Sequence, residues 1–295
     1  AVEEDAEVRK AARDALMGLF READATTLTE GIKLLDTDRE TLPLRIELLR
    51  LYVKRQRTAK AESLPADLRR LGMALGESGE HAQSAATLLE GYKLLQATAK
   101  TADQQFTLQA LWGDCATAAL NASDPAYAKL LAAPPDESLF DSGYAILTAR
   151  LDALRKDQHY LPIVALSDVA LSQLAKQLSP SRTRQLQSLR QWAKTKQAAL
   201  DAQQIKTLLP DLLSADLDTR DEAIKAVMPL GRRAIAPLLD QIEAKLKQTP
   251  PAPRDEGTLF DLLRQIEPAV GDYDPAATPE TKTELLKSLR KQFVK

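Results

Sequence analysis

The sequence predicts an all-α fold built from stacked antiparallel helical hairpins. Of its 295 residues, 50 are leucine and 46 are alanine, and both residue types strongly favour helices. Valine and isoleucine, which favour β-strands, supply only 8 and 9 residues. Apolar residues recur with helical spacing along almost the whole chain, between short polar turns. Because so many short helices cannot form one four-helix bundle, we expect them to stack as hairpins.

We expect four segments, 1–58, 64–200, 202–248 and 249–295, and the first holds helices at about 3–21, 27–35 and 40–57. Asp36 and Asp38 are expected to cap a helix at a turn. The apolar face of the first helix comprises Val8, Ala12, Ala15, Leu16, Leu19 and Phe20.

The second segment opens with a helix at about 64–75, followed by a glycine-containing turn at 76–79. Proline follows a capping residue at Ser179-Pro180, a pattern typical of a helix start. The remaining helices of this segment are expected at about 80–97, 103–119, 125–132, 137–156, 160–178 and 180–200.

The last two segments are separated by a change in composition. Helices are expected at about 203–213, 219–230 and 234–247 in the third segment. Proline-rich linkers are expected at 249–257 and 271–279, with short amphipathic helices at about 258–266 and 280–294.

The third segment resembles a HEAT repeat. A first helix with leucines and Pro210 turns at Asp216 into a second helix with Arg220 and Ala223, and Pro237 restarts the pattern. Two weaker echoes lie at the front of the chain. The first comprises Asp5, Val8, Arg9, Ala12 and Leu16, and the second comprises Asp38, Leu44, Arg45 and Leu48.

The middle of the chain is similar to a tetratricopeptide repeat, which alternates large and small residues along paired helices. Gly79 falls at the turn, and Gln96 departs from the proline expected at the end. The matching positions are Leu68, Leu71, Gly72, Leu75, Ser84, Leu88 and Gly91. The two resemblances together imply an α-solenoid, HEAT-like at both ends and tetratricopeptide-like in the middle. Both families chiefly form protein-binding scaffolds.

No residue pattern points to catalysis, a cofactor or a metal. The only cysteine, Cys115, lies in an apolar helical pattern and is expected to be a buried small residue. His81 and His159 are the only histidines and neither lies in a nucleophile motif, so both are expected to be exposed or capping residues. The acidic residues Asp216 and Asp218 are expected to cap a repeat helix, and Asp272 and Asp274 to lie in a proline-bounded turn.

Two basic regions are candidates for partner binding. No acidic residue occurs between Asp168 and Asp201, although this interval holds six basic residues. They surround the helix, so a solvated face is the plainer interpretation. The last helix is basic and amphipathic, and it could dock on the chain itself, enter a partner's groove or lie on a membrane surface. The candidate partner-binding residues are Arg184, Arg190, Lys194, Lys287, Arg290 and Lys291.

The function expected is a non-enzymatic scaffold for another protein, or a structural subunit of a larger assembly. The alternatives are an accessory helical arm of an enzyme and a HEAT-like nucleic-acid-binding protein. A net charge of −2 and 4% aromatic residues disfavour nucleic acid as a partner. The acidic start, Ala1-Val2-Glu3-Glu4-Asp5, suits a mature secreted or periplasmic bacterial protein, although a cytoplasmic location stays open.

Overall fold

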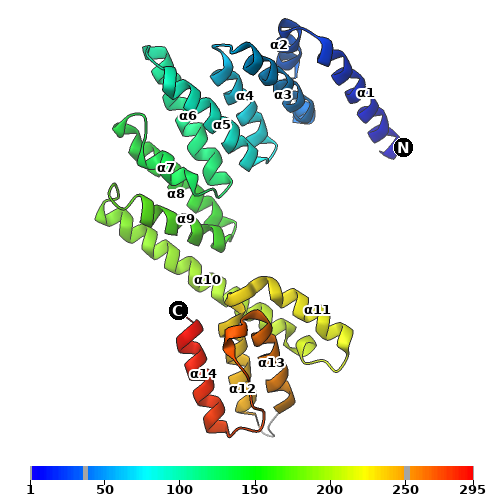
Figure 1. Ribbon diagram of the computed structural model, residues 1–295, viewed down its shortest axis with the longest axis vertical. Coiled ribbons are helices and arrows are strands. Elements are labelled where there is room, and N and C mark those ends of the chain that lie inside the picture. The colour runs from blue at the N-terminus through cyan, green and yellow to red at the C-terminus, as the bar shows by residue number, and fades with distance from the viewer. Residues whose placement is uncertain (1, 36–38, 249–252, 295) are drawn as a thin grey trace. The chain divides into compact units, whose positions relative to one another are not determined.

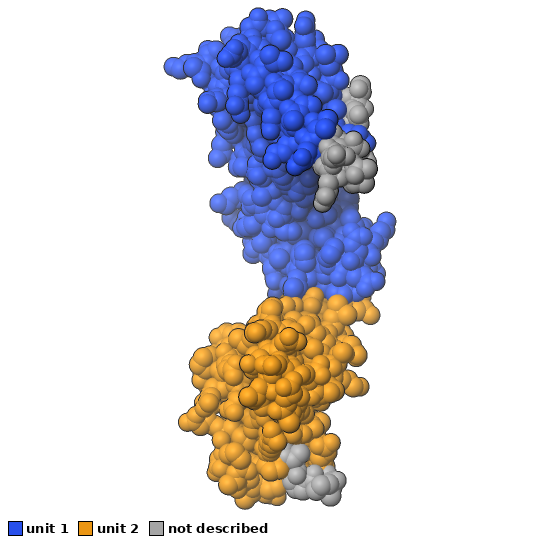
Figure 2. All heavy atoms as spheres, turned by 90° about the vertical axis from the view of Figure 1, so that its right-hand side faces the viewer, with its two compact units in different colours: residues 1–190 blue, residues 191–295 orange. Residues whose placement is uncertain are grey.

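The computed structural model describes residues 2–35, 39–248 and 253–294, and within these ranges it is helical without any strand (Figure 1). Neighbouring helices pack on one another, as an all-α fold requires. The chain divides into two compact units, residues 1–190 and 191–295 (Figure 2). The expected division into four segments is finer than this and stays a prediction.

Unit 1 is a succession of helices joined by short turns, and most of these helices pack chiefly on their neighbours in sequence. Its last helix, α10, continues into unit 2. The helices are α1 (Val2–Glu22), α2 (Ala25–Leu34), α3 (Leu42–Ala59), α4 (Leu64–Glu77), α5 (His81–Thr98), α6 (Ala102–Asn121), α7 (Ala126–Ala132), α8 (Phe140–Lys156), α9 (Tyr160–Gln173) and α10 (Pro180–Leu212).

Helices α4 and α5 interlock through small residues at the positions that the tetratricopeptide-like pattern predicts. Gly72 lies against Leu88 so closely that a Cβ atom added to it would stand 2.5 Å from Leu88 Cγ. In the same contact between α4 and α5, Gly91 lies against Leu68, and a Cβ atom added to Gly91 would stand 3.2 Å from Leu68 Cβ. The turn between the helices uses Gly79 at φ +85°, a backbone conformation that favours glycine.

The next layer of unit 1 is organised by Trp112 on α6. Its indole Nε1 donates to the carbonyl oxygen of Leu130 at 2.8 Å, and the side chain is fully buried. Gly143 on α8 lets the ring approach, since an added Cβ would stand 2.7 Å from it. Cys115 is buried beside this layer, as expected, and burial raises the pKa of its thiol to about 12. At this pKa the thiolate, which is the reactive form, is scarce at neutral pH.

Asp67 in the first turn of α4 is a buried carboxyl group whose Oδ2 atom has no hydrogen-bond partner. Burial raises its pKa above the usual range, against weaker opposing effects of Ser63 and Arg70. The folded chain therefore binds this proton more tightly than the unfolded chain does. Asp67 stabilises the fold most at low pH, and this contribution is lost as the pH rises through the raised pKa.

Replacing Asp67 with asparagine is therefore expected to raise the thermal stability of unit 1 at neutral pH and to have less effect as the pH falls below about 4, the unfolded pKa. Thermal unfolding followed over this pH range measures the difference. Asp103→Asn is the matched control, because Asp103 is an exposed carboxylate in the first turn of α6. Equal effects of the two substitutions at all pH values would contradict the prediction.

In the described residues of unit 2, the end of α10 and four further α-helices surround one core. The core brings together leucines of α12, α13 and α14, including Leu238, Leu263, Leu286 and Leu289. The helices are α11 (Leu217–Val227), α12 (Ile235–Leu246), α13 (Pro253–Ile266) and α14 (Pro279–Phe293). Asp216 caps α11 by accepting a hydrogen bond from the Thr219 backbone N–H at 3.1 Å, as the HEAT-like pattern predicts.

Three boundaries expected from the sequence are wrong, and one of them is the end of the helix expected at about 160–178, which the structure places at Gln173. The expected helices 180–200 and 203–213 form one helix, α10, because alanines surround Asp201 and neither glycine nor proline interrupts it there. Asp201 lies buried within α10 and accepts hydrogen bonds from Gln197 and Arg233. Residues 253–257 of the expected first linker begin α13, since proline and acidic residues suit a first helical turn.

Several expectations rest on residues that the structure does not describe. Asp36 and Asp38, with residues 249–252 of the first linker, lie outside the described ranges. The backbone of α1 includes Asp5 and Arg9, but their side chains lie outside the description.

Candidate functional site

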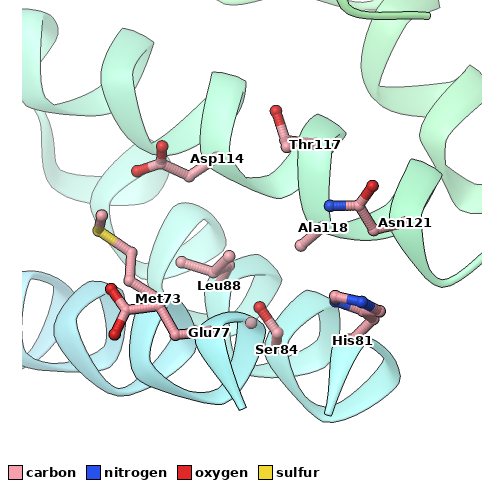
Figure 3. A pocket seen from close by; sticks show the side chains of 10 residues that line it. Met73, Glu77, His81, Ser84, Leu88, Asp114, Thr117, Ala118 and Asn121 are labelled. Atoms are coloured by element: carbon pink, nitrogen blue, oxygen red, sulfur yellow. The ribbon is translucent and has the colours of Figure 1, made fainter. Parts of the chain in front are cut away.

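A hollow of about 210 Å³ opens between α4, α5 and α6 in unit 1 (Figure 3). Its floor consists of small and apolar side chains, and polar side chains stand around its rim. The lining residues are Met73, Gly76, Glu77, His81, Ser84, Leu88, Asp114, Thr117, Ala118 and Asn121. Because they come from three successive helices, the packing of these helices determines the geometry of the hollow.

The hollow exists because its floor is made of small residues. A Cβ atom added to Gly76 would stand 3.3 Å from Ser84 Oγ, so little space separates α4 from α5 below the opening. Ser84 is buried, and its Oγ donates to the carbonyl oxygen of Gly72 at 2.7 Å. Since this proton is directed at a backbone acceptor and not at a base, the arrangement does not activate Ser84 as a nucleophile.

Both carboxylates of the rim are held by arginines of neighbouring helices. Glu77 pairs with Arg45 of α3, and Asp114 pairs with Arg69 of α4, whose Nε lies 2.5 Å from Asp114 Oδ2. His81 is half-buried at the start of α5, and Asn121 ends α6. Both line the hollow, and among the described contacts the side chains of His81 and Asn121 make no hydrogen bond.

A second hollow, of about 170 Å³, opens on the other side of α4. It shares Met73 and Glu77 with the first, so these two side chains form a ridge between the hollows. The second hollow is lined by Ile32, Arg45, Leu49, Arg70, Met73, Ala74 and Glu77. We call the two hollows and their shared ridge the α4 surface.

The α4 surface is suited to holding side chains rather than a whole small molecule. Pockets that enclose drug-sized ligands have volumes of about 300–1,000 Å³. Each hollow here is smaller than that, and the two lie on either side of α4. Met73 on the ridge is 47% exposed, so its flexible apolar side chain is accessible to a segment that crosses α4.

The candidate residues expected from the sequence lie elsewhere, and none lines the α4 surface. On α10, Arg190 pairs with Asp168, whereas Arg184 and Lys194 are exposed. On α14, Arg290 pairs with Asp240 at 2.6 Å and Glu243 at 3.0 Å. Lys287 and Lys291 are exposed on α14. Two of the six residues, Arg190 and Arg290, therefore form ion pairs with acidic residues of other helices.

The apolar face of α14 docks on the chain itself, which is one of the outcomes expected for this helix. Leu286 and Leu289 are buried in the core of unit 2, and α14 packs on α12. This face is therefore occupied and does not lie free for a partner groove or a membrane surface.

The other polar residues singled out in the sequence have ordinary surroundings. His159 is exposed before α9, and Asp274 accepts a hydrogen bond from the Ala276 backbone N–H in a turn. Over residues 2–35, 39–248 and 253–294, no group of three or more histidine, cysteine or acidic side chains could hold a metal ion. No helix in these ranges is long and apolar enough to cross a membrane.

Comparison with models of known protein families, with curated proteins and with solved structures finds no match for this chain. The α4 surface is therefore defined by its geometry alone. Sequence reasoning singled out Arg45, Gly76, His81, Ser84 and Leu88 near it, but only as repeat positions, a turn glycine and a histidine. The missed signal is the four-residue spacing that puts Met73 and Glu77 on one face of α4, and Asp114 and Ala118 on one face of α6.

Proposed function

We propose that this protein is a binding scaffold and that its α4 surface holds a segment of another protein. The observation that supports this is the pair of hollows on either side of α4, which share Met73 and Glu77. A peptide lying across α4 can place one side chain in each hollow. His81 and Asn121 are free to bond its backbone, as a groove that recognises peptides requires.

We also propose that the helices of this scaffold form an α-solenoid. The close approach of Gly72 to Leu88 and of Gly91 to Leu68 supports a tetratricopeptide-like pair at α4 and α5. The cap at Asp216 supports a HEAT-like turn before α11. Stacked repeats form extended binding surfaces, and we propose that the α4 surface is part of such a surface.

The experiment is a selection of peptides from a displayed random library against the full chain. We expect selected peptides to bind the wild type and to lose most of their affinity for Met73→Arg. The larger, charged side chain would stand on the ridge between the two hollows and obstruct a peptide that crosses it. Titration calorimetry measures the affinity. Hydrogen exchange is expected to slow on binding in residues 73–81 and 114–121.

Leu161→Arg is the matched control. Leu161 on α9 is 44% exposed, close to the value for Met73, and it lines neither hollow. The two variants therefore carry the same change of charge and size at equally exposed apolar positions. Peptides that bind Met73→Arg as tightly as Leu161→Arg would contradict the proposal, as would a selection that enriches no binding peptide.

A further inference from the structure

The two hollows of the α4 surface differ in the charge of the side chains that line them. Glu77 and Asp114 line the first hollow, and none of its described lining residues is a lysine or an arginine. Arg45 and Arg70 line the second hollow, where the shared Glu77 is the only acidic side chain among the described lining residues. The ridge on α4 therefore separates an acidic hollow from a predominantly basic one.

The rotation of α4 agrees with this division. At about 100° per residue, Arg70 and Ala74 fall about 60° and about 100° to one side of Met73. Gly76 falls about 60° to the other side of Met73. Arg70 and Ala74 line only the second hollow, whereas Gly76 lines only the first. Arg70 is therefore placed on the side of the ridge away from Asp114.

The carboxylates of the first hollow keep acceptor atoms for a ligand. Asp114 accepts through Oδ2 from Arg69, which lines neither hollow, and Glu77 accepts through Oε2 from Arg45, across the ridge. An ionised carboxylate has two acceptor oxygens, and among the described hydrogen bonds none uses Asp114 Oδ1 or Glu77 Oε1. Figure 3 shows these two side chains on opposite sides of the hollow, Glu77 on α4 and Asp114 on α6.

A lysine side chain of a partner matches the first hollow. Its compact ammonium group has three donors that point in different directions, whereas the planar guanidinium group of arginine suits a single carboxylate. Carboxylates that approach from two helices therefore favour lysine. The methylene stem of lysine can lie on apolar side chains, and Met73, Leu88 and Ala118 provide them here.

The second hollow suits an acidic side chain of the same partner. Arg70 is exposed, and none of the ion pairs among the described residues includes it. It acts by charge on Asp67, which is buried one turn earlier on α4. Arg45 lines the same hollow and pairs with Glu77. The guanidinium group of Arg70 is therefore the cation that a partner carboxylate can reach.

We propose that the segment bound by the α4 surface carries two opposite charges. A lysine enters the first hollow, where Asp114 and Glu77 hold its ammonium group. An aspartate or glutamate lies beside Arg70 in the second hollow, and the segment crosses the ridge at Met73. This inference rests on the proposed function, because it names the chemistry of the segment that the scaffold binds.

The probes are the peptides selected from the random library against the full chain, made with acetylated and amidated ends so that only side chains carry charge. We expect the tight binders to contain a lysine and an acidic residue. Replacing the lysine with norleucine removes the ammonium group and is expected to weaken binding about tenfold or more. Replacing the acidic residue with its amide is expected to weaken binding about two- to fivefold, because Arg70 is exposed.

Double-mutant cycles between peptide and protein assign each charge to its hollow. Asp114→Asn is expected to couple to the peptide lysine and not to the acidic residue, and Arg70→Gln is expected to show the reverse. Glu77→Gln is a second variant of the first hollow, at a side chain that is 56% exposed. Glu90→Gln is the control, because Glu90 also pairs with an arginine, Arg57, but lines neither hollow. It is expected to couple to neither charge.

Two results would overturn this inference and leave the scaffold proposal standing. The first is a set of selected peptides that lose affinity for Met73→Arg but contain no lysine. The second is a lysine whose replacement with norleucine weakens binding equally in the wild type, Asp114→Asn and Glu77→Gln. A selection that enriches no binding peptide is a different failure, because it contradicts the proposed function and this inference together.

Discussion

Replacing Lys282 with methionine is expected to destabilise unit 2 by about 3–5 kcal/mol, the usual cost of removing one partner of a buried ion pair. Lys282 Nζ lies 2.9 Å from Glu256 Oε2, and the side chains are only 9% and 3% exposed. The Tyr273 hydroxyl donates to the same carboxylate oxygen at 2.6 Å. Without the ammonium group, Glu256 is left as a buried charge with one neutral donor, which cannot replace the lost solvation.

The double variant Glu256→Gln/Lys282→Met is expected to recover most of this loss, because it removes both charges and keeps an acceptor for Tyr273. Urea dependence of hydrogen exchange in α13 and α14 measures the stability of unit 2 within the full chain. Lys247→Met is the surface control. Lys247 pairs with Glu243 at 2.7 Å but is 74% exposed, so its loss is expected to cost about 0.3–0.5 kcal/mol. A Lys282→Met variant as stable as Lys247→Met would contradict the prediction.

The Lys282–Glu256 pair shows what sequence patterns do not contain. Glu256 lies in a stretch that composition marks as a proline-rich linker, and Tyr273 lies in another. In the structure Tyr273 stacks on Phe260 with ring centroids 4.6 Å apart, and its ring lies 5.3 Å from Lys282 Nζ. Glu256, Tyr273 and Lys282 lie in separate segments of the sequence, and they come into contact only in the folded unit. Local composition indicates which backbone conformation a segment prefers. It does not show which side chains of other helices will contact that segment.

Local patterns do predict the helices and their close contacts. Gly72, Ser84 and Gly91 were expected to be small so that paired helices could approach, and all three lie in the contact of α4 with α5. This worked because repeat periodicity and helix packing depend on the same spacing of large and small side chains. Helical periodicity also identifies the apolar face of α1, but it does not show whether anything covers this face, and Val8, Leu16 and Leu19 are exposed in the structure.

The candidate site was less accessible to sequence reasoning. The expected residues were basic ones, because uneven charge is visible in a sequence, yet the structure pairs Arg190 and Arg290 with acids on other helices. The α4 surface depends on which side chains of α4 and α6 stand opposite each other. This alignment of α4 with α6 follows from the turn at Gly79 and from the length of α5. Neither of these features appears in the sequence as a pattern of charged or reactive residues.

The contact of Gly72 with Leu88 is expected to show strong energetic coupling in a double-mutant cycle. Leu88→Ala alone should cost about 2–5 kcal/mol, because this side chain is fully buried and leaves a cavity. Gly72→Ala alone should cost about 1–3 kcal/mol by overpacking, because its new Cβ would stand 2.5 Å from Leu88 Cγ and 2.7 Å from Leu88 Cδ2.

The two changes should oppose each other when combined. In the double variant the new Cβ at position 72 occupies space that Leu88 vacates, so the total loss should be smaller than the sum of the single losses by more than about 1 kcal/mol. Gly113→Ala, in the middle of α6 with no atom within 4 Å of its added Cβ, should instead stabilise the chain by about 0.5–1 kcal/mol. Unfolding in urea gives all four free energies. Additive losses at positions 72 and 88 would mean that these two positions are not coupled across the contact of α4 with α5. The close approach of Gly72 to Leu88 would then not be what fixes the spacing of the two helices below the hollow.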